Sequence, residues 1–483
     1  MSEQSGSLAQ LSHEQRVRLE NSLLDGVASS ETGNVPRQAS SEAPLTAAQW
    51  RLWYLAQLDP ESPAYNQLQV IQLSGSLDAA ALQRSIDTLS ARHDSLRLSI
   101  CSRNELPVQM CGALLPYKIS TLKLAQSTIT EQEDTAWRAC AQWQEQLFEM
   151  SEAPLWRIRL IKFNDTKHWL VRTCHHIISD GWSNRLYWQE LAHAYNAFTK
   201  DESPVFQPLR TSYIDFAVWQ KQWLDSESTH LLESYWSQRL AGLERLELPT
   251  DHPRKPQAKA SGRIYSFSLP SELAEAIGSL ARAQNASNYM VLLSAFQVLL
   301  HSYTRQNDIA IGSPVANRTL PETEGIYGLF ANTLVMRADC ANDPEFAKLL
   351  EQTKKHTLDA IDHQALPFEK LVEILNPKRD ATRNPLFDVL FAVQNMPANE
   401  WSLPELGCQR LTPPGLTVKF DLSLVVYESA ARMTCQIEYA SALYDKESIE
   451  GMGRLFSKVL RGCLLYTSPS PRDATLSRMP SSA

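Results

Sequence analysis

The chain has 483 residues, of which 43% are hydrophobic and 21% are charged, a composition typical of folded proteins rather than disordered or fibrous ones. Lys and Arg number 46 against 54 Asp and Glu, and the net charge of -8 argues against a nucleic-acid partner, which would require a basic surface. The polar first residues, and the lack of an apolar run of about 18 residues, predict a cytoplasmic protein without a membrane partner. The length predicts about three domains, or two large lobes.

Cysteine and glycine usage narrow the chemistry. The eight cysteines form no Cys-x-x-Cys pair, so we expect scattered thiols in a reducing compartment and no metal site. The 17 glycines form neither of the phosphate-binding patterns G-x-G-x-x-G and G-x-x-x-x-G-K-S/T. The substrate of any bond formation that costs energy must therefore arrive already activated.

Both ends of the chain are expected to lie outside the folded lobes. A short amphipathic helix is predicted over residues 11–24, and residues 26–44 are rich in Ser, Glu, Gly and Pro, as linkers are. We therefore treat residues 1–44 as a helix and a flexible linker. Residues 463–483 resemble the translation of a transposase sequencing adapter, which we interpret as an artefact of a gene read off the end of a DNA fragment.

Helical and strand patterns alternate between these ends. Thr46 is a candidate N-cap for a first helix. Further helices are expected over residues 78–93, 183–197, 213–240, 270–284 and 289–303, and strands over residues 156–161, 168–176, 264–269 and 308–312. Residues 201–211 contain two prolines and no regular period. The sequence therefore predicts an α/β protein with one lobe over residues 45–211 and a second over residues 212–462.

The densest chemical signal is the string HHIISDG at residues 175–181, where a predicted strand ends and a helix begins. Side chains alternate between the faces of a strand, so only one of His175 and His176 can serve a given cavity. Imidazole has an unperturbed pKa of about 6.5, which suits a base or an orienting group at neutral pH. Asp180 can accept backbone hydrogen bonds or pair with an arginine, and Gly181 permits a conformation or close approach that a β-carbon would block.

HHIISDG fits the HHxxxDG signature of nonribosomal peptide synthetase condensation domains, and six further stretches resemble this family's motifs in order. Asp94 stands where the family usually has glutamate, and Ala331 where valine is usual. The stretches are TAAQWRLWYL (46–55), RHDSLRLSI (92–100), YIDFAVWQ (213–220), IYGLFANTLVMR (326–337), HQALPFE (363–369) and RDATRNPLF (379–387).

The resemblance implies an α/β (α+β) fold, a V-shaped pseudodimer of two chloramphenicol-acetyltransferase-like lobes around a central tunnel. Phosphopantetheine arms of a donor and an acceptor carrier domain would enter the tunnel from opposite faces. The reaction would transfer an acyl or peptidyl group from its thioester to the α-amine of an aminoacyl thioester, forming an amide. The domain itself would bind no cofactor, because activation to the thioester takes place elsewhere.

The resemblance also implies roles for individual residues. His176 would face the tunnel and either take the proton from the amine or hold the amine in line for attack. Since an α-amino group has a pKa of about 7.7 to 8.0, both roles stay open. His175, Asp180 and Gly181 would be structural, with Asp180 paired with Arg92 or Arg97.

Three further positions are expected near the substrate. Trp182 and Ser183 follow the histidine motif directly, and Asn332 matches a family position near the tunnel from the opposite side. Asn332 can equally be read as a turn-forming amide.

Other functions remain open alternatives. An epimerisation domain has the same two lobes and histidine pair, but the sequence after Asp180 and the later stretches favour condensation. A degenerate domain that only recruits partners usually loses the tunnel histidine, which is present here as His176. A free acyltransferase that makes esters is only weakly excluded, and heterocyclisation is disfavoured because that class replaces the histidines with aspartates.

The subtype and the partners are less closely defined. HHIISDGWS, RNPLFDVLF and VKFDLSL (418–424) look most like the subtype that joins two L-residues, while the position near Met1 also suits a starter domain with a fatty-acyl donor. An adenylation domain is expected downstream. The predicted helix over residues 11–24 is a candidate docking element for an upstream synthetase.

Overall fold

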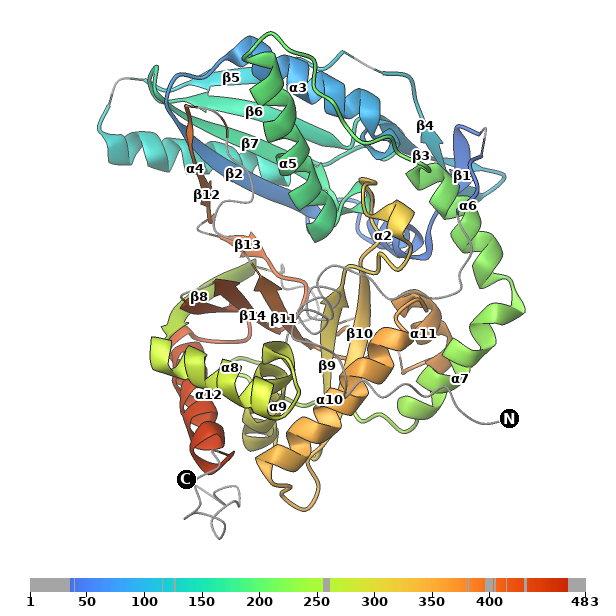
Figure 1. Cartoon of the computed structure of the whole chain (residues 1–483), viewed down its shortest axis with the longest axis vertical. Coiled ribbons are helices and arrows are strands. Elements are labelled where there is room, and N and C mark those ends of the chain that lie inside the picture. Colours follow the sequence, from blue (N-terminus) through green and yellow to red (C-terminus); the bar gives the residue numbers. More distant parts are fainter. Residues whose placement is uncertain are drawn as a thin grey trace.

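The computed structural model describes residues 35–38, 40–114, 116–125, 127–254, 261–378, 380, 382–395, 403, 405–413, 415–429 and 432–467. The helix expected over residues 11–24 and most of the interpreted adapter sequence lie outside these residues. Two lobes, each built on a β-sheet, lie one above the other in Figure 1.

The first half of the chain alternates strands and helices as the sequence predicts. Thr46 and Asp78 are the N-caps of the first two helices, each accepting a hydrogen bond from the helix backbone. The elements are β1 (Glu42–Pro44), α2 (Ala47–Leu58), β2 (Asn66–Ser74), α3 (Ala79–Arg92), η2 (Asp94–Arg97), β3 (Leu98–Arg103), β4 (Leu106–Cys111), β5 (Ser120–Lys123), α4 (Ile129–Glu145), β6 (Trp156–Lys162), β7 (Lys167–His175), η3 (His176–Ile178) and α5 (Gly181–Phe198).

The second half has the same mixed character, but the helix expected over residues 213–240 is interrupted after Leu224. The elements are α6 (Tyr213–Leu224), η4 (Glu227–Thr229), α7 (His230–Arg239), β8 (Ser261–Leu269), α8 (Ser271–Ala283), α9 (Asn288–Thr304), β9 (Asp308–Val315), η5 (Pro321–Thr323), β10 (Asn332–Asp339), α10 (Phe346–Asp362), α11 (Phe368–Leu375), β11 (Val389–Asn395), β12 (Gly407–Leu411), β13 (Leu416–Thr417), β14 (Leu422–Ser429), β15 (Arg432–Ala440) and α12 (Lys446–Thr467).

The upper lobe contains a five-stranded sheet in the order β12-β2-β7-β6-β5 and a small sheet in the order β1-β4-β3. In β6, Trp156, Ile158 and Leu160 are buried and alternate with more exposed arginines, which confirms the predicted alternating strand. The helices α3 and α5 pack against each other beside this sheet. The catalytic candidates follow directly from its central strand, β7.

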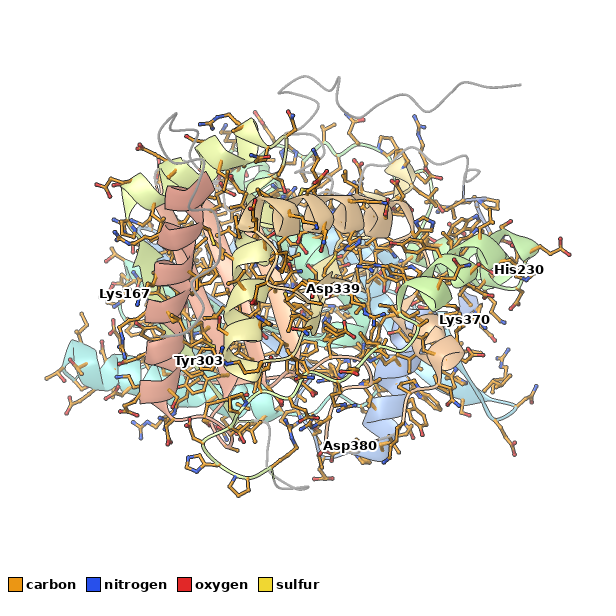
Figure 2. The ribbon with its side chains drawn as sticks, turned by 90° about the horizontal axis from the view of Figure 1, so that it is seen from below. Lys167, His230, Tyr303, Asp339, Lys370 and Asp380 are labelled. Atoms are coloured by element: carbon orange, nitrogen blue, oxygen red, sulfur yellow. The ribbon has the colours of Figure 1, made fainter. Side chains whose placement is uncertain are left out.

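The lower lobe contains a seven-stranded sheet in the order β10-β9-β11-β14-β15-β8-β13. Helices α8, α9, α10 and α12 cover one face, as Figure 2 shows from below, with Tyr303 labelled near the end of α9 and Asp339 at the end of β10. The strongly apolar α9 lies in the middle of this core, with Leu292, Leu293 and Phe296 almost fully buried.

The core does not divide at a single point after residue 211. Tyr213 and Phe216 of α6 pack in the upper-lobe core together with Tyr327 and Phe330. The strand β12, from late in the chain, pairs antiparallel with β2 in the upper sheet. Helical periodicity identifies an apolar face but not the core that receives it, so the sequence could not reveal this exchange between the lobes.

The last described helix, α12, continues past residue 462 to Thr467. Cys463 and Leu464 pack against the lower-lobe core. The first residues of the interpreted adapter sequence therefore extend a helix that is already docked on the lobe.

Candidate active site

The histidine motif occupies the junction between β7 and α5. β7 ends at His175, and the one-turn helix η3 begins at His176. The strand alternation that predicts opposite faces for the two histidines therefore stops between them. Nδ1 of His175 accepts a hydrogen bond from the Ile177 N–H at 3.1 Å, and the Asp180 carboxylate caps α5 by accepting from the Ser183 N–H at 2.7 Å.

Nδ1 of His176 has a hydrogen-bond partner, whereas Nε2 has none among the residues that the structure describes. Its Nδ1 lies 2.5 Å from the Ser179 carbonyl oxygen, and its backbone N–H donates to the Tyr65 carbonyl at 2.8 Å. Because a carbonyl oxygen only accepts, Nδ1 carries the hydrogen and Nε2 keeps its lone pair. Burial and the nearby Lys419 ammonium lower the pKa of His176 to about 3. The ring is therefore neutral at physiological pH and can accept a hydrogen bond or a proton at Nε2.

His175 is buried and packs among aromatic rings. Its ring centroid lies 6.4 Å from that of Tyr65 and 6.3 Å from that of Phe148. Burial, and then the neighbouring His176, lower the pKa of His175 to about 3. These contacts fit the predicted structural role, in which a neutral ring fixes the end of β7.

Asp180 joins the histidine loop to a segment from the second half of the chain. Its carboxylate accepts hydrogen bonds from the backbone N–H groups of Phe330 at 2.9 Å and Ala331 at 3.1 Å. Its nearest cation is Arg318, at 3.6 Å, and both side chains are almost fully buried. Each carboxylate oxygen is thus satisfied, as a buried charge requires.

The prediction that Asp180 pairs with Arg92 or Arg97 is wrong. Arg97 pairs with Asp94 at 2.6 Å, and Arg92 pairs with Glu190 at 3.0 Å. Both arginines thus have acidic partners in the upper lobe. The partner of Asp180 is Arg318, which lies in the loop between β9 and η5. No pattern in the sequence of that loop indicates that it contacts the histidine motif.

Ser183 and Trp182 bind the histidine loop to the segment that contains Arg318. Ser183 is fully buried, and its hydroxyl donates to the Gly328 carbonyl at 2.6 Å and accepts from Arg318 at 2.8 Å. Trp182 donates from its indole nitrogen to the Glu324 carbonyl at 2.9 Å. These contacts do not support the expectation that Ser183 lies beside the substrate, because its hydroxyl is engaged by groups from the second half of the chain.

Gly181 marks an opening at the start of α5. It is exposed, and a β-carbon built on it would meet no atom within 4 Å. Among the described residues, none makes the close approach at Gly181 for which the sequence allowed. The space beside Gly181 lies next to the motif that carries the partly exposed His176.

The Asn332 amide is fully used by backbone groups. Its nitrogen donates to the carbonyls of Gln364 at 2.8 Å and Leu366 at 2.7 Å, and its oxygen accepts from the N–H groups of Phe368 at 2.9 Å and Thr333 at 2.8 Å. These contacts support the alternative reading of Asn332 as a structural amide. It holds the HQALPFE segment at the start of α11.

Lys419 lies near the histidine motif, and the sequence did not single it out. Its ammonium lies 5.1 Å from the centre of the Tyr65 ring. Desolvation and the nearby Arg51 lower the pKa of Lys419 to about 8. VKFDLSL contains this lysine, but nothing in that stretch relates it to the histidines.

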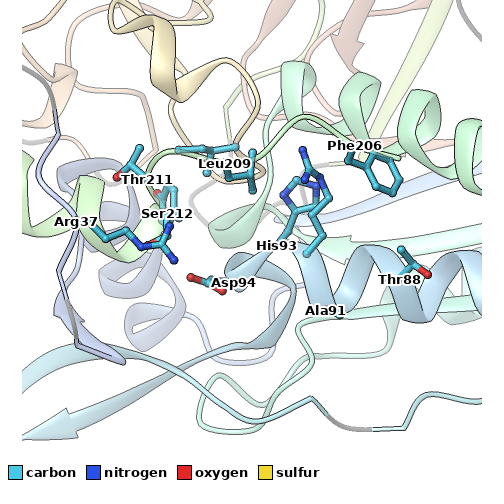
Figure 3. A pocket seen from close by; sticks show the side chains of 12 residues that line it. Arg37, Thr88, Ala91, His93, Asp94, Phe206, Leu209, Thr211 and Ser212 are labelled. Atoms are coloured by element: carbon cyan, nitrogen blue, oxygen red, sulfur yellow. The ribbon is translucent and has the colours of Figure 1, made fainter. Parts of the chain in front are cut away.

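A separate cavity of about 440 Å³ lies where the end of α3 meets the start of α6 (Figure 3). Its wall includes His93, Asp94 and Phe206, together with Arg37. The lining contains neither histidine of the motif. In the wall, Nε2 of His93 lies 2.5 Å from Glu190, so the acidic side chain holds α3 to α5.

Neither a metal site nor a membrane-spanning helix is found in the described part of the chain. Within those residues, no group of three or more His, Cys, Asp or Glu side chains is arranged to hold a metal ion. Among the same residues, no helix combines the length and apolarity needed to span a membrane.

Comparison with known proteins identifies relatives of this chain. The family model described as "Condensation domain" matches residues 39–480. A linear gramicidin synthase of Brevibacillus parabrevis is 36% identical over 434 residues, covering 88% of this chain and 8% of that protein. Tyrocidine synthase 2 of the same organism is 37% identical over 427 residues, covering 88% of this chain and 12% of that protein. The chain thus spans about a tenth of the length of these relatives.

Solved structures share the fold at lower identity. The X-domain from teicoplanin biosynthesis, in its complex with OxyB, has a TM-score of 0.81 and 23% identity, covering 91% of this chain and 97% of that one. The starter condensation domain of rhizomide synthetase has a TM-score of 0.74 and 21% identity, covering 88% and 95%. The pseudodimer of two chloramphenicol-acetyltransferase-like lobes is thereby confirmed as the fold.

Proposed function

Because the chain belongs to the condensation domain family of nonribosomal peptide synthetases, we propose that it forms an amide bond between two carrier-bound thioesters. Condensation domains are acyltransferases that make peptide bonds and bind no cofactor themselves. Their substrates are attached to phosphopantetheine on partner carrier domains. The donor is proposed to be an acyl or peptidyl thioester, and the acceptor an aminoacyl thioester with a free α-amine.

One observation carries this proposal: Nδ1 of His176 lies 2.5 Å from the Ser179 carbonyl oxygen, a contact that requires hydrogen on Nδ1 and so leaves the lone pair of a neutral ring on Nε2. A nitrogen of this kind can accept a hydrogen bond from the attacking amine and hold its lone pair toward the thioester carbon. Gly181, in the same loop, is exposed, and a β-carbon there would meet no atom within 4 Å.

The reaction balances without any external oxidant, reductant or nucleotide. The amine nitrogen forms a bond to the thioester carbon, and the carbonyl π electrons move onto oxygen. Nε2 of His176 accepts a hydrogen bond from the attacking nitrogen and holds it in line, because a ring with a pKa of about 3 does not retain the surplus proton. Collapse of the intermediate breaks the carbon–sulfur bond, and the surplus proton of the nitrogen passes to the departing sulfur, which becomes the free phosphopantetheine thiol.

The finer assignments are also proposals. The stretches HHIISDGWS, RNPLFDVLF and VKFDLSL support the subtype that joins two L-residues, with a fatty-acyl starter donor as the alternative. An adenylation domain is proposed as a downstream neighbour, and residues 11–24 as a docking element for an upstream synthetase.

The test is reconstitution of the reaction with the whole chain. The protein is mixed with a donor carrier loaded with an acyl or aminoacyl group and an acceptor carrier loaded with an amino acid, and the mass of the acceptor is followed. The expected result is a mass gain equal to the transferred acyl group, which is absent with His176→Ala. Inversion of the acceptor α-carbon without mass gain would instead identify an epimerisation domain.

A soluble alcohol offered beside the amine acceptor separates ester formation from amide formation. We expect product from the amine alone. A lack of product with every acyl and peptidyl donor tested would favour a domain that only recruits partners.

A further inference from the structure

Lys419 reaches the histidine loop from the opposite lobe. It lies between β13 and β14, the strands that return the chain to the lower sheet. Its ammonium stands 5.1 Å from the centre of the ring of Tyr65, the residue directly before β2 of the upper lobe. The Tyr65 carbonyl in turn accepts the backbone N–H of His176 at 2.8 Å. Tyr65 therefore places the lysine beside the loop that carries the reactive imidazole.

The Lys419 ammonium has no polar partner in the part of the chain that the structure describes. Among those residues it makes no hydrogen bond and no ion pair within 4.0 Å, and its contact is with the face of an aromatic ring. A lysine at a protein surface commonly lies along an aromatic ring in this way. Here, the side chain is exposed, and desolvation, then the nearby Arg51, lower the pKa of Lys419 to about 8.

None of the other charged and titratable groups around Lys419 forms an ion pair with it within the described part of the chain. Arg51 lies 3.6 Å from Glu369 and over the Phe368 ring. The neighbouring His175 and His176 are neutral, since both have a pKa of about 3. Burial raises the pKa of Glu438 and of the Tyr65 phenol, and no ion pair joins Glu438 to Lys419 among the described residues. Three ammonium hydrogens of Lys419 thus remain available to a ligand.

We propose that Lys419 is a further catalytic residue, whose ammonium donates a hydrogen bond to the carbonyl oxygen of the donor thioester. This inference rests on the proposed amide-forming function. Attack by the amine moves the carbonyl electrons onto that oxygen, and a fixed cation stabilises the resulting negative charge more than it stabilises the neutral carbonyl. His176 accepts a hydrogen bond from the nitrogen while Lys419 donates one to the oxygen. When the intermediate collapses, the oxygen returns to a carbonyl and the sulfur leaves.

The test compares Lys419→Met, Lys419→Arg and the control Lys458→Met, which changes an exposed lysine of α12. Single-turnover amide formation is measured with loaded carriers from pH 6.5 to 9.5, and the melting temperature of each variant is recorded. Removing one donor from an oxyanion commonly lowers the rate about 10²- to 10³-fold. We expect that loss in Lys419→Met with an unchanged melting temperature, and wild-type rates in Lys458→Met.

Lys419→Arg tests whether the positive charge of the side chain, rather than its packing, supports the reaction. Wild-type activity should fall above about pH 8, where Lys419 loses its proton, whereas Lys419→Arg should keep its charge and retain activity to higher pH. A rate within threefold of wild type in Lys419→Met, or an alkaline limit that does not move in Lys419→Arg, would overturn the role of Lys419. Absence of amide product in the wild type itself would overturn the proposed function, and the role of Lys419 with it.

Discussion

The Asp180 carboxylate lies 3.6 Å from the Arg318 guanidinium, and the two side chains are buried together where the histidine loop meets the segment before β10. Arg318 also donates to the Ile326 carbonyl at 2.7 Å and to Ser183 at 2.8 Å. Asp180 accepts from the backbone of the same segment at Phe330. The aspartate of the motif therefore acts as a clamp between the histidine loop and a segment from the second half of the chain, inside the upper-lobe core.

Asp180→Ala should destabilise the protein strongly. Removing one partner of a buried ion pair leaves the other charge uncompensated, at a cost of about 3 to 5 kcal/mol in the free energy of unfolding. Denaturant unfolding is the measurement, with Asp225→Ala as the control, because Asp225 forms an exposed pair with Lys221 on α6. An exposed pair of this kind is worth about 0 to 1 kcal/mol. Equal stabilities of the two variants would contradict the clamp.

Much of the local structure around this clamp could be predicted from the sequence. Thr46 and Asp78 are N-caps because their short polar side chains accept backbone hydrogen bonds, a preference expressed within three residues of chain. The position of HHIISDG at a strand end follows from the same kind of local pattern. The structure places it there, between β7 and α5.

Contacts between distant segments could not be predicted in this way. Arg318 and Lys419 lie in loops without regular periodicity, and only the packing of the two lobes brings them to the histidine loop. The sequence instead directed attention to Arg97, which is the nearer arginine in its motif but pairs with Asp94. A single sequence carries no signal for which of several arginines reaches a buried carboxylate.

His176 should keep one tautomer and one charge state across the physiological pH range. Its pKa of about 3 means that the ring stays neutral from pH 8 down to pH 5, with hydrogen on Nδ1 and a lone pair on Nε2. Nitrogen NMR of the imidazoles, assigned by comparison with His176→Ala, would show constant shifts over that range. A titration midpoint near 6.5 for this ring would disprove the assignment.

Gly328→Ala should destabilise the packing of α6 against the segment before β10 in the upper-lobe core. A β-carbon at Gly328 would lie 2.2 Å from the Tyr213 ring, which is fully buried and hydrogen-bonded to the Leu329 carbonyl at 2.8 Å. Overpacking of a core commonly costs about 1 to 3 kcal/mol, so thermal unfolding should shift down by several degrees. Gly415→Ala is the matched control, because its β-carbon would meet no atom within 4 Å. A Gly328→Ala variant as stable as the control would show that the Tyr213 ring can move aside.

The buried His175 should make the protein less stable in mild acid. Its folded pKa of about 3 lies below the ordinary value of 6.5, so the unfolded chain binds the proton first as the pH falls. Stability is therefore unaffected above about pH 6.5 and is lost progressively toward pH 3. Between pH 7 and pH 5 this one group should remove about 2 kcal/mol from the free energy of unfolding.

The measurement for His175 is urea unfolding at pH 7 and at pH 5. The difference between the two free energies of unfolding should be smaller by about 2 kcal/mol in His175→Phe than in the wild type. His230→Phe, at an exposed position at the start of α7, controls for the loss of an imidazole, and an equal pH difference in His175→Phe and His230→Phe would contradict the assignment of a neutral, buried His175.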